Sequence, residues 1–336
     1  MHVNSVWERN SRSSEAVRLS SIRPPCPGGG DRPNRSAFQI LFPGVLLGVA
    51  LLAGCAKPAA PADAGKPWTA ANAADKRYPL TGEIVSIDAA RKVLVVRHDK
   101  VKDYMPAMTM EFIVAPGDLA IVRHGERIRA EMVPSKDGDF RLEKIWPDDQ
   151  VAATTVAAGA RALRQDTLIR GKGVYREVGE VLPDFALYDQ TGRVVQSRRF
   201  RGKQIMLNFI FTRCPASTMC PASTTKMIGA QKLARDAGIP NIEFVSLTLD
   251  PAYDTPGVLR DYADRRGIET TNFSFLTGPD NAIKDLLAQF GVIAEFDGDL
   301  LKHSLATLLI NAEGRIIHRA DGSAWEPKDF VAKMRK

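Results

Sequence analysis

The chain of 336 residues is long enough for about two domains, and 44% hydrophobic with 25% charged residues is a globular composition, which excludes a disordered chain or a fibrous repeat. The formal net charge is +7, residues 1–54 contribute six Lys or Arg against three Asp or Glu, and no run of five basic residues occurs. A small and dispersed excess of basic residues is typical of a solvated surface. We therefore expect no nucleic-acid partner. Four cysteines are too few for a disulfide scaffold at this length, and each needs its own explanation.

An uncharged, largely apolar run at 38–53 follows Arg32 and Arg35 and leads directly to Cys55. Basic residues, a short apolar run and small residues at its end are typical of a secretion signal, and the run is short for a membrane span. Residues 52–55, Leu-Ala-Gly-Cys, resemble a bacterial lipobox. This resemblance implies a lipid on the Cys55 thiol and a mature lipoprotein anchored to a membrane of the cell envelope, facing the periplasm.

Residues 1–54 form a leader longer than a secretion signal requires, so we expect the true start to lie downstream of Met1. Cys26 falls in this leader and is given no function. Residues 55–77 are rich in Ala and Pro, show no apolar period and predict a flexible tether. The first domain is therefore expected at 78–148.

Short alternating segments with β-branched residues, separated by turn residues, follow this tether. Five of them predict strands: Gly82–Ile87, Val93–Arg97, Thr109–Val114, Arg127–Val133 and Phe140–Ile145. Five short strands in so few residues predict a small closed barrel, of which an OB-like barrel is one form.

Soft metal-binding side chains gather in one part of this domain: His98 ends a predicted strand, and Met105, Met108 and Met110 follow it closely. Met108 and Met110 are two residues apart on a strand, so they point to the same face, where either core packing or metal binding would suit them. An imidazole with thioethers is a soft, uncharged donor set that suits Cu(I) or Ag(I).

Residues 78–148 resemble the periplasmic copper-binding CusF family, whose Pro-x-Met-Thr-Met signature stands here at 106–110. The resemblance implies that His98, Met108 and Met110 hold Cu(I). Met105 replaces the tryptophan that makes a cation–π contact in that family, so this contact is missing, and Met105 is either a third thioether ligand or a shield for the metal. His124 lies in a charged turn and is expected at the surface.

Residues 149–178 are rich in Ala and Thr, then basic, and they predict a linker with at most one short helix. Strands and helices alternate beyond it, in 179–336. We expect strands at Gln204–Phe211, Ile242–Leu249, Ser274–Thr277, Ala306–Asn311 and Arg315–His318, and helices at Pro221–Asp236, Thr255–Gly267, Asp280–Phe290 and Glu326–Arg335. The predicted fold class is therefore two domains, a small all-β OB-like barrel followed by an α/β thioredoxin-like domain.

Cys214 and Cys220 lie between a buried strand and the following helix. A thiol at a helix N-terminus is near unpaired N–H groups, which favours its thiolate. The five intervening residues permit a redox or structural disulfide, or two sulfurs that share one soft ion.

The two cysteines, the segment Asp250–Pro256 and His303 followed by Ser304 resemble the Sco/SenC family of copper chaperones for cytochrome oxidase assembly. The resemblance implies copper, as Cu(I) or also Cu(II), on Cys214, Cys220 and His303. It also implies a partner that is a cytochrome c oxidase subunit or another copper acceptor of the envelope. That family usually has three residues between its cysteines, and the five found here leave more room for dithiol redox chemistry.

Two further polar residues of this domain, Asp250 and His318, have several possible roles. Asp250 is either an acceptor that holds a ligand in place or part of the turn into the following helix. His318 has no partner pattern and is expected to be structural.

We therefore predict an envelope copper-binding protein or copper chaperone in which a linker of about 30 residues lets copper pass between two sites. A copper-tolerance buffer is one alternative. Another is a thiol–disulfide oxidoreductase with Cys214 and Cys220 as catalytic residues. General thioredoxin-like reductases have a proline before the hairpin strand, whereas no proline occurs here between Pro279 and Pro327, and Cys-x-x-Cys is absent. A peroxidase is disfavoured because Thr212 is only two residues before Cys214.

Overall fold

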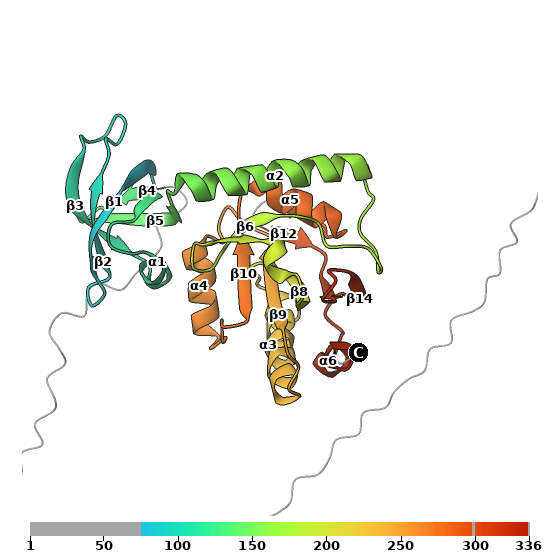
Figure 1. Ribbon diagram of the computed structural model, residues 1–336. Coiled ribbons are helices and arrows are strands. Elements are labelled where there is room, and N and C mark those ends of the chain that lie inside the picture. The colour runs from blue at the N-terminus through green and yellow to red at the C-terminus, as the bar shows by residue number, and fades with distance from the viewer. Residues whose placement is uncertain (1–74, 298–299, 335–336) are drawn as a thin grey trace, which may run out of the picture. The chain divides into compact units, whose positions relative to one another are not determined.

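The structure is a computed structural model that describes residues 75–297 and 300–334 (Figure 1). Cys26, Cys55, the apolar run at 38–53 and nearly all of the predicted tether lie outside the described residues. The secretion signal and the lipid anchor therefore stay predictions. Among the described helices, none combines the length and the apolar character that crossing a membrane requires.

The first folded region is a closed barrel with strand order β1-β2-β3-β5-β4, which confirms the predicted barrel. Its elements are β1 (Tyr78–Asp88), β2 (Val93–His98), β3 (Met108–Val114), α1 (Pro116–Ile121), β4 (Arg127–Pro134) and β5 (Phe140–Pro147). Every second side chain of β2 and β3 points inward, so Leu94, Val96, Phe112 and Val114 are fully buried. The helix α1 was not predicted, because its six residues are too few to show a helical period.

The predicted linker is instead a long helix, α2 (Gln150–Arg170). The Asp149 carboxylate accepts hydrogen bonds from the first free N–H groups of this helix, and its many alanines favour helix. Its buried stripe is narrow, with only Val156, Ala160 and Leu163, which explains why no apolar face was evident in the sequence. The helix is much longer than the short one expected for this stretch, and only Asp148 and Asp149 separate β5 from α2.

The second folded region contains a seven-stranded sheet with the order β14-β13-β8-β9-β10-β6-β7. Strands β8, β9 and β10 are parallel, and β13 runs antiparallel to β8. The strands are β6 (Ala186–Asp189), β7 (Val194–Gln196), β8 (Gln204–Ile210), β9 (Ile242–Thr248), β10 (Phe273–Thr277), β13 (Ala306–Ile310) and β14 (Ile316–Asp321). Every strand predicted for this region is present, and the predicted thioredoxin-like fold is confirmed.

Helices cover both faces of this sheet, as Figure 1 shows. The remaining elements are η1 (Ser197–Phe200), α3 (Cys220–Asp236), α4 (Pro256–Arg265), α5 (Asp280–Gln289), α6 (Pro327–Met334) and a separate hairpin, β11 (Ala294–Asp297) with β12 (Leu300–His303). Phe209 packs in a core with side chains of α2 and α5, whereas Met206 packs in another with α3, α4 and α6. The continuous apolar run of β8 is therefore explained by burial on both sides.

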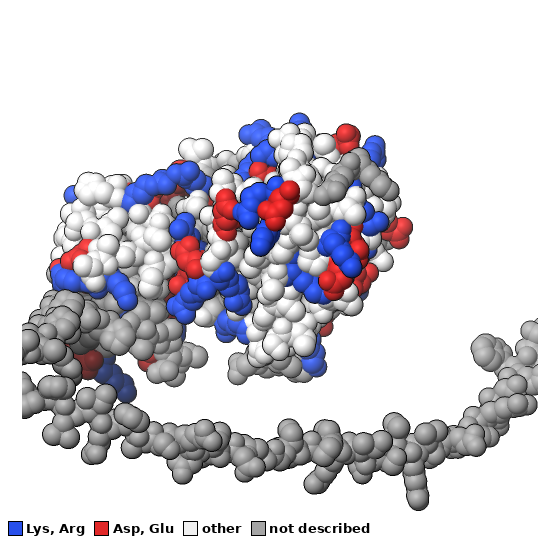
Figure 2. All heavy atoms as spheres, turned by 90° about the horizontal axis from the view of Figure 1, so that it is seen from below, with Lys and Arg blue, Asp and Glu red and all other residues white. Residues whose placement is uncertain are grey.

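Charged side chains of both signs lie next to one another on the face that Figure 2 shows. Several neighbours on helices form ion pairs, such as Arg265 with Asp261 at 2.7 Å on α4 and Lys284 with Asp280 at 2.7 Å on α5. Mixed charges of this kind are typical of a solvated surface.

A buried arginine joins α2 to the rest of this region. The Arg176 guanidinium donates to Asp166 Oδ2 on α2, to Gln289 Oε1 on α5 and to the Val181 carbonyl, each at 2.6 Å. Arg176 is only 8% exposed. A single side chain therefore ties together two helices and the segment that leads to β6.

Replacing this arginine tests whether α2 is an integral part of the domain. We expect Arg176→Met to lower the free energy of unfolding by about 2 kcal/mol, because three acceptors lose a charged donor. Arg161→Met, an exposed arginine of the same helix, is the control and should change it by less than about 0.5 kcal/mol. Urea unfolding followed by circular dichroism measures both, and equal stabilities would contradict the assignment of α2 to this domain.

Candidate metal centres

Strand pairing explains why His303 lies close to cysteines that are far from it in sequence. The residue pair Thr307 and Asn208 sets the antiparallel register of β13 against β8. In this register the start of β13 lies beside the end of β8. His303 precedes β13 and Cys214 follows β8, so both residues lie at the same edge of the sheet. Cys220 begins α3, which starts at that edge.

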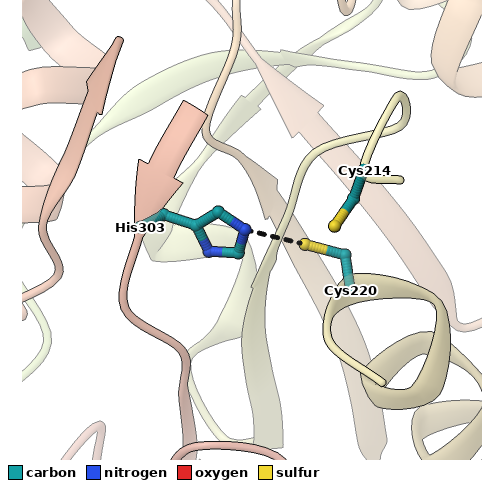
Figure 3. A group of neighbouring side chains, drawn as sticks. All are labelled: Cys214, Cys220 and His303. Carbon is teal, nitrogen blue, oxygen red and sulfur yellow. Dashed lines mark hydrogen bonds between the residues drawn. The ribbon is translucent and has the colours of Figure 1, made fainter. Parts of the chain in front are cut away.

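The structure brings Cys214, Cys220 and His303 together, as the sequence predicted (Figure 3). The two sulfurs and a ring nitrogen of His303 all lie within 4.8 Å of one another. Both cysteines are free thiols. Three donors this close can hold one soft metal ion between them, and the two sulfurs are also near enough for a disulfide after a small movement.

The His303 ring is held with one nitrogen directed at the sulfurs. Its Nδ1 lies 3.1 Å from the Ser304 carbonyl, and because a carbonyl can only accept, Nδ1 carries the proton. Nε2 therefore carries no proton and can accept, and it lies 3.6 Å from Cys220 Sγ. Burial lowers the pKa of His303, which favours the neutral ring that a metal requires.

Cys220 differs from the sequence expectation. Burial, followed by the neighbouring Cys214, raises the pKa of the Cys220 thiol to about 12. The prediction that a helix N-terminus makes it a thiolate is therefore wrong for the metal-free protein. Because Cys220 is fully buried, its thiolate would lack hydration by water, and the N–H groups of the helix end do not compensate for this loss. Cys220 instead stays protonated and donates toward His303 Nε2.

Cys220 is fully buried whereas Cys214 is half-buried, and this difference predicts that alkylation selects Cys214. At neutral pH we expect iodoacetamide to modify Cys214 at least about tenfold faster than Cys220, because Cys220 is buried and stays protonated until the pH approaches its pKa of about 12. Peptide mass spectrometry of the reduced, metal-free chain measures the two rates. The same chain in urea is the control and should show similar rates, whereas similar rates in the folded chain would contradict the assigned protonation.

The barrel places its predicted ligands at one end of the β2–β3 ladder. His98 lies directly opposite Met108, and Met110 is two residues further along the same inward face. His98 is only 1% exposed, Met110 is half-buried and Met108 is 47% exposed. These side chains therefore lie close together at this end of the barrel, with His98 buried and Met108 open to solvent.

His98 shows the ring arrangement found at His303. Its Nδ1 donates to the Asp99 carbonyl at 2.7 Å, and its Nε2 is buried with no partner among the described residues. Buried polar atoms are nearly always paired, so an unpaired acceptor of this kind is suited to binding a metal ion. The Asp99 carboxylate is held in turn by Thr81 and Arg127, each at 2.6 Å.

Met105 lies at the same end of the barrel. Reciprocal backbone hydrogen bonds of 3.0 and 3.2 Å between Val101 and Met105 close the turn that carries it. Met105 and Met110 pack against the same barrel core. The position of Met105 therefore suits a ligand as well as a shield.

The other histidines of the described region lie as expected from the sequence. His124 is exposed in its turn, and the His318 ring packs on Phe330 with a centroid distance of 4.9 Å. Sequence reasoning gave no role to Arg213 and Asp254, two residues near the cysteines. Their contacts join residues about 40 positions apart, and the paired aspartates of the 250–254 turn were the only local signal.

Comparison with known proteins gives matches for both folded regions. The SCO1/SenC family model matches residues 174–336, and the model of the copper binding periplasmic protein CusF matches residues 77–147. The helix α2 falls between these two matches.

Individual relatives match the second region. The SCO2-like protein of Rickettsia conorii is 32% identical over 167 residues, which cover 47% of this chain and 78% of that protein. The SCO1 protein homolog of Bacillus subtilis is 28% identical over 159 residues, 45% of this chain and 79% of that protein. Among solved structures, Arabidopsis thaliana ScoI with copper bound is similar at 24% identity and a TM-score of 0.41, over 47% of this chain and 95% of that chain.

Proposed function

The chain belongs to the SCO1/SenC family, and on this premise we propose that it is an envelope copper-binding protein that delivers copper for cytochrome c oxidase assembly. One observation carries the proposal: two free thiols and an unprotonated imidazole nitrogen lie within 4.8 Å of one another. A CusF-like domain on the same chain supports copper as the cargo.

The site of the second domain suits both oxidation states of copper. Two sulfurs favour Cu(I), and the neutral imidazole also permits Cu(II). The donors that would hold the ion are Cys214, Cys220 and His303. Because Cys220 is protonated at neutral pH, loading must release its proton, and copper binding at this site weakens as the pH falls.

The site of the barrel has a different character. Its donors are the His98 nitrogen and the sulfurs of Met108, Met110 and Met105. Thioethers carry no proton, so only the imidazole makes binding depend on pH. A neutral, sulfur-rich set of this kind selects Cu(I) or Ag(I) over hard divalent cations.

The cellular setting follows from the leader and the family together. The lipobox-like tetrapeptide would anchor the chain through Cys55 to a membrane, on the periplasmic side. The acceptor would be a cytochrome c oxidase subunit or another copper protein of the envelope.

A thiol–disulfide oxidoreductase is the second candidate, and the closeness of the two free sulfurs favours it. One thiolate would attack a disulfide of the substrate and the other would resolve the mixed disulfide. The high pKa of Cys220 leaves Cys214, at the half-buried position, as the attacking sulfur. Insulin reduction measured beside copper loading separates this activity from copper delivery.

Two independent sites predict the copper stoichiometry. Anaerobic titration should load about two Cu(I) per wild-type chain, and about one after Cys214→Ser or after Met108→Leu, because each substitution removes a donor from one site. His318→Gln is the control and should still load about two. Full loading of both site variants, measured by metal content, would contradict the two-site proposal.

Met105 can be tested separately, in a Cys214→Ser background. If it is a ligand, Met105→Leu should weaken Cu(I) binding about tenfold, since the volume is kept and one sulfur is lost. Met132→Leu, in the buried core of the same barrel, is the matched control and should leave the affinity unchanged. Competition with a chromophoric Cu(I) chelator measures both, and an unchanged affinity for Met105→Leu would assign Met105 to shielding.

A further inference from the structure

Cys214 lies on a loop with few fixed points of its own. Between it and Cys220, residues Pro215, Ser217 and Thr218 are exposed. The Cys214 thiol lies 3.7 Å from the Ala216 carbonyl, interacts with the Cys220 thiol and packs against the edge of the core. Cys220, in contrast, is buried in the first turn of α3. The residues just before Cys214 are more firmly attached than this exposed loop, and they are the ones that can fix its position.

Those residues are attached to the turn between β9 and α4. The Asp254 carboxylate is fully buried and accepts hydrogen bonds from the Thr212 hydroxyl and from the Thr212 N–H, the latter at 3.3 Å. Its second oxygen also accepts from the Thr248 hydroxyl at 2.6 Å. One carboxylate thus joins the ends of β8 and β9 immediately before Cys214.

A second attachment involves the residue next to the cysteine. Arg213 donates to Asp250 Oδ2 at 2.7 Å, and this carboxylate is 2% exposed. The guanidinium also lies over the Tyr253 ring, 4.2 Å from its centroid. Arg213 is therefore held by charge on one side and by an aromatic face on the other.

From these contacts we propose that Thr212 and Arg213 are positioning residues that hold Cys214 within reach of Cys220 and His303. The acidic turn at 250–254 is the fixed base, and neither Thr212 nor Arg213 touches the metal. The loop of five residues between the cysteines leaves Cys214 free to move away, and these two attachments restrain it. This inference rests on the proposed function, because it concerns the copper affinity of the same site.

Two pairs of variants test it in the full chain with Met108→Leu, which leaves the second site to be measured. Thr212→Val removes the hydroxyl donor at constant shape, and Arg213→Met removes the charge. We expect each to weaken Cu(II) binding about tenfold and to reduce the thiolate-to-Cu(II) charge-transfer absorption. Thr212→Ser and Arg213→Lys keep the donor and the charge, and should stay within about threefold of the parent.

Thermal unfolding of the metal-free variants separates positioning from general destabilisation. If Thr212→Val and Arg213→Met unfold at lower temperature but keep the parent affinity and absorption, the positioning role is wrong. Cys214→Ser is measured alongside: should the parent bind Cu(II) no better than Cys214→Ser, the proposed copper site itself fails. The two failures are therefore distinguishable.

Discussion

The site of the second domain depends on the pairing of β13 with β8. His303 and Cys220 are 83 residues apart in sequence, and no local interaction brings them together. The antiparallel register, with Thr307 opposite Asn208, places the start of one strand beside the end of the other. Both strands are buried on both faces, so a slip of one residue would exchange the side chains that pack in the two cores. The hydrophobic core therefore fixes the distance between an imidazole and two sulfurs.

The two proposed metal sites share one arrangement although their folds differ. In both, a histidine ends a strand and its Nδ1 donates to the carbonyl of the next residue, Asp99 in the barrel and Ser304 in the second domain. The other nitrogen is left with a lone pair, directed into a buried space in one case and at a thiol in the other. The protein thus selects the tautomer with its own backbone, without a carboxylate partner.

The sequence predicted elements whose signal is local. The alternation in β2 and β3 predicted the barrel, and the apolar run of β8 predicted the central sheet. The family resemblance predicted that His303 lies near the two cysteines. The helix α2 was missed because alanine propensity, not an apolar face, forms it. The protonation of Cys220 was missed because burial is a tertiary property that outweighs its place at a helix end. The contacts of Arg213 and Asp254 were missed for the same reason, since they join separate turns.

The locked histidine rings have a consequence for how an ion would leave. A ring hydrogen-bonded to the backbone resists turning outward, so at the proposed sites a departing copper ion would first exchange its bonds to sulfur. In the barrel that side opens to solvent at Met108, and in the second domain at Cys214. An incoming ligand from another protein would meet these sulfurs first and replace them one at a time. The bond between the imidazole and the ion would be the last to be exchanged.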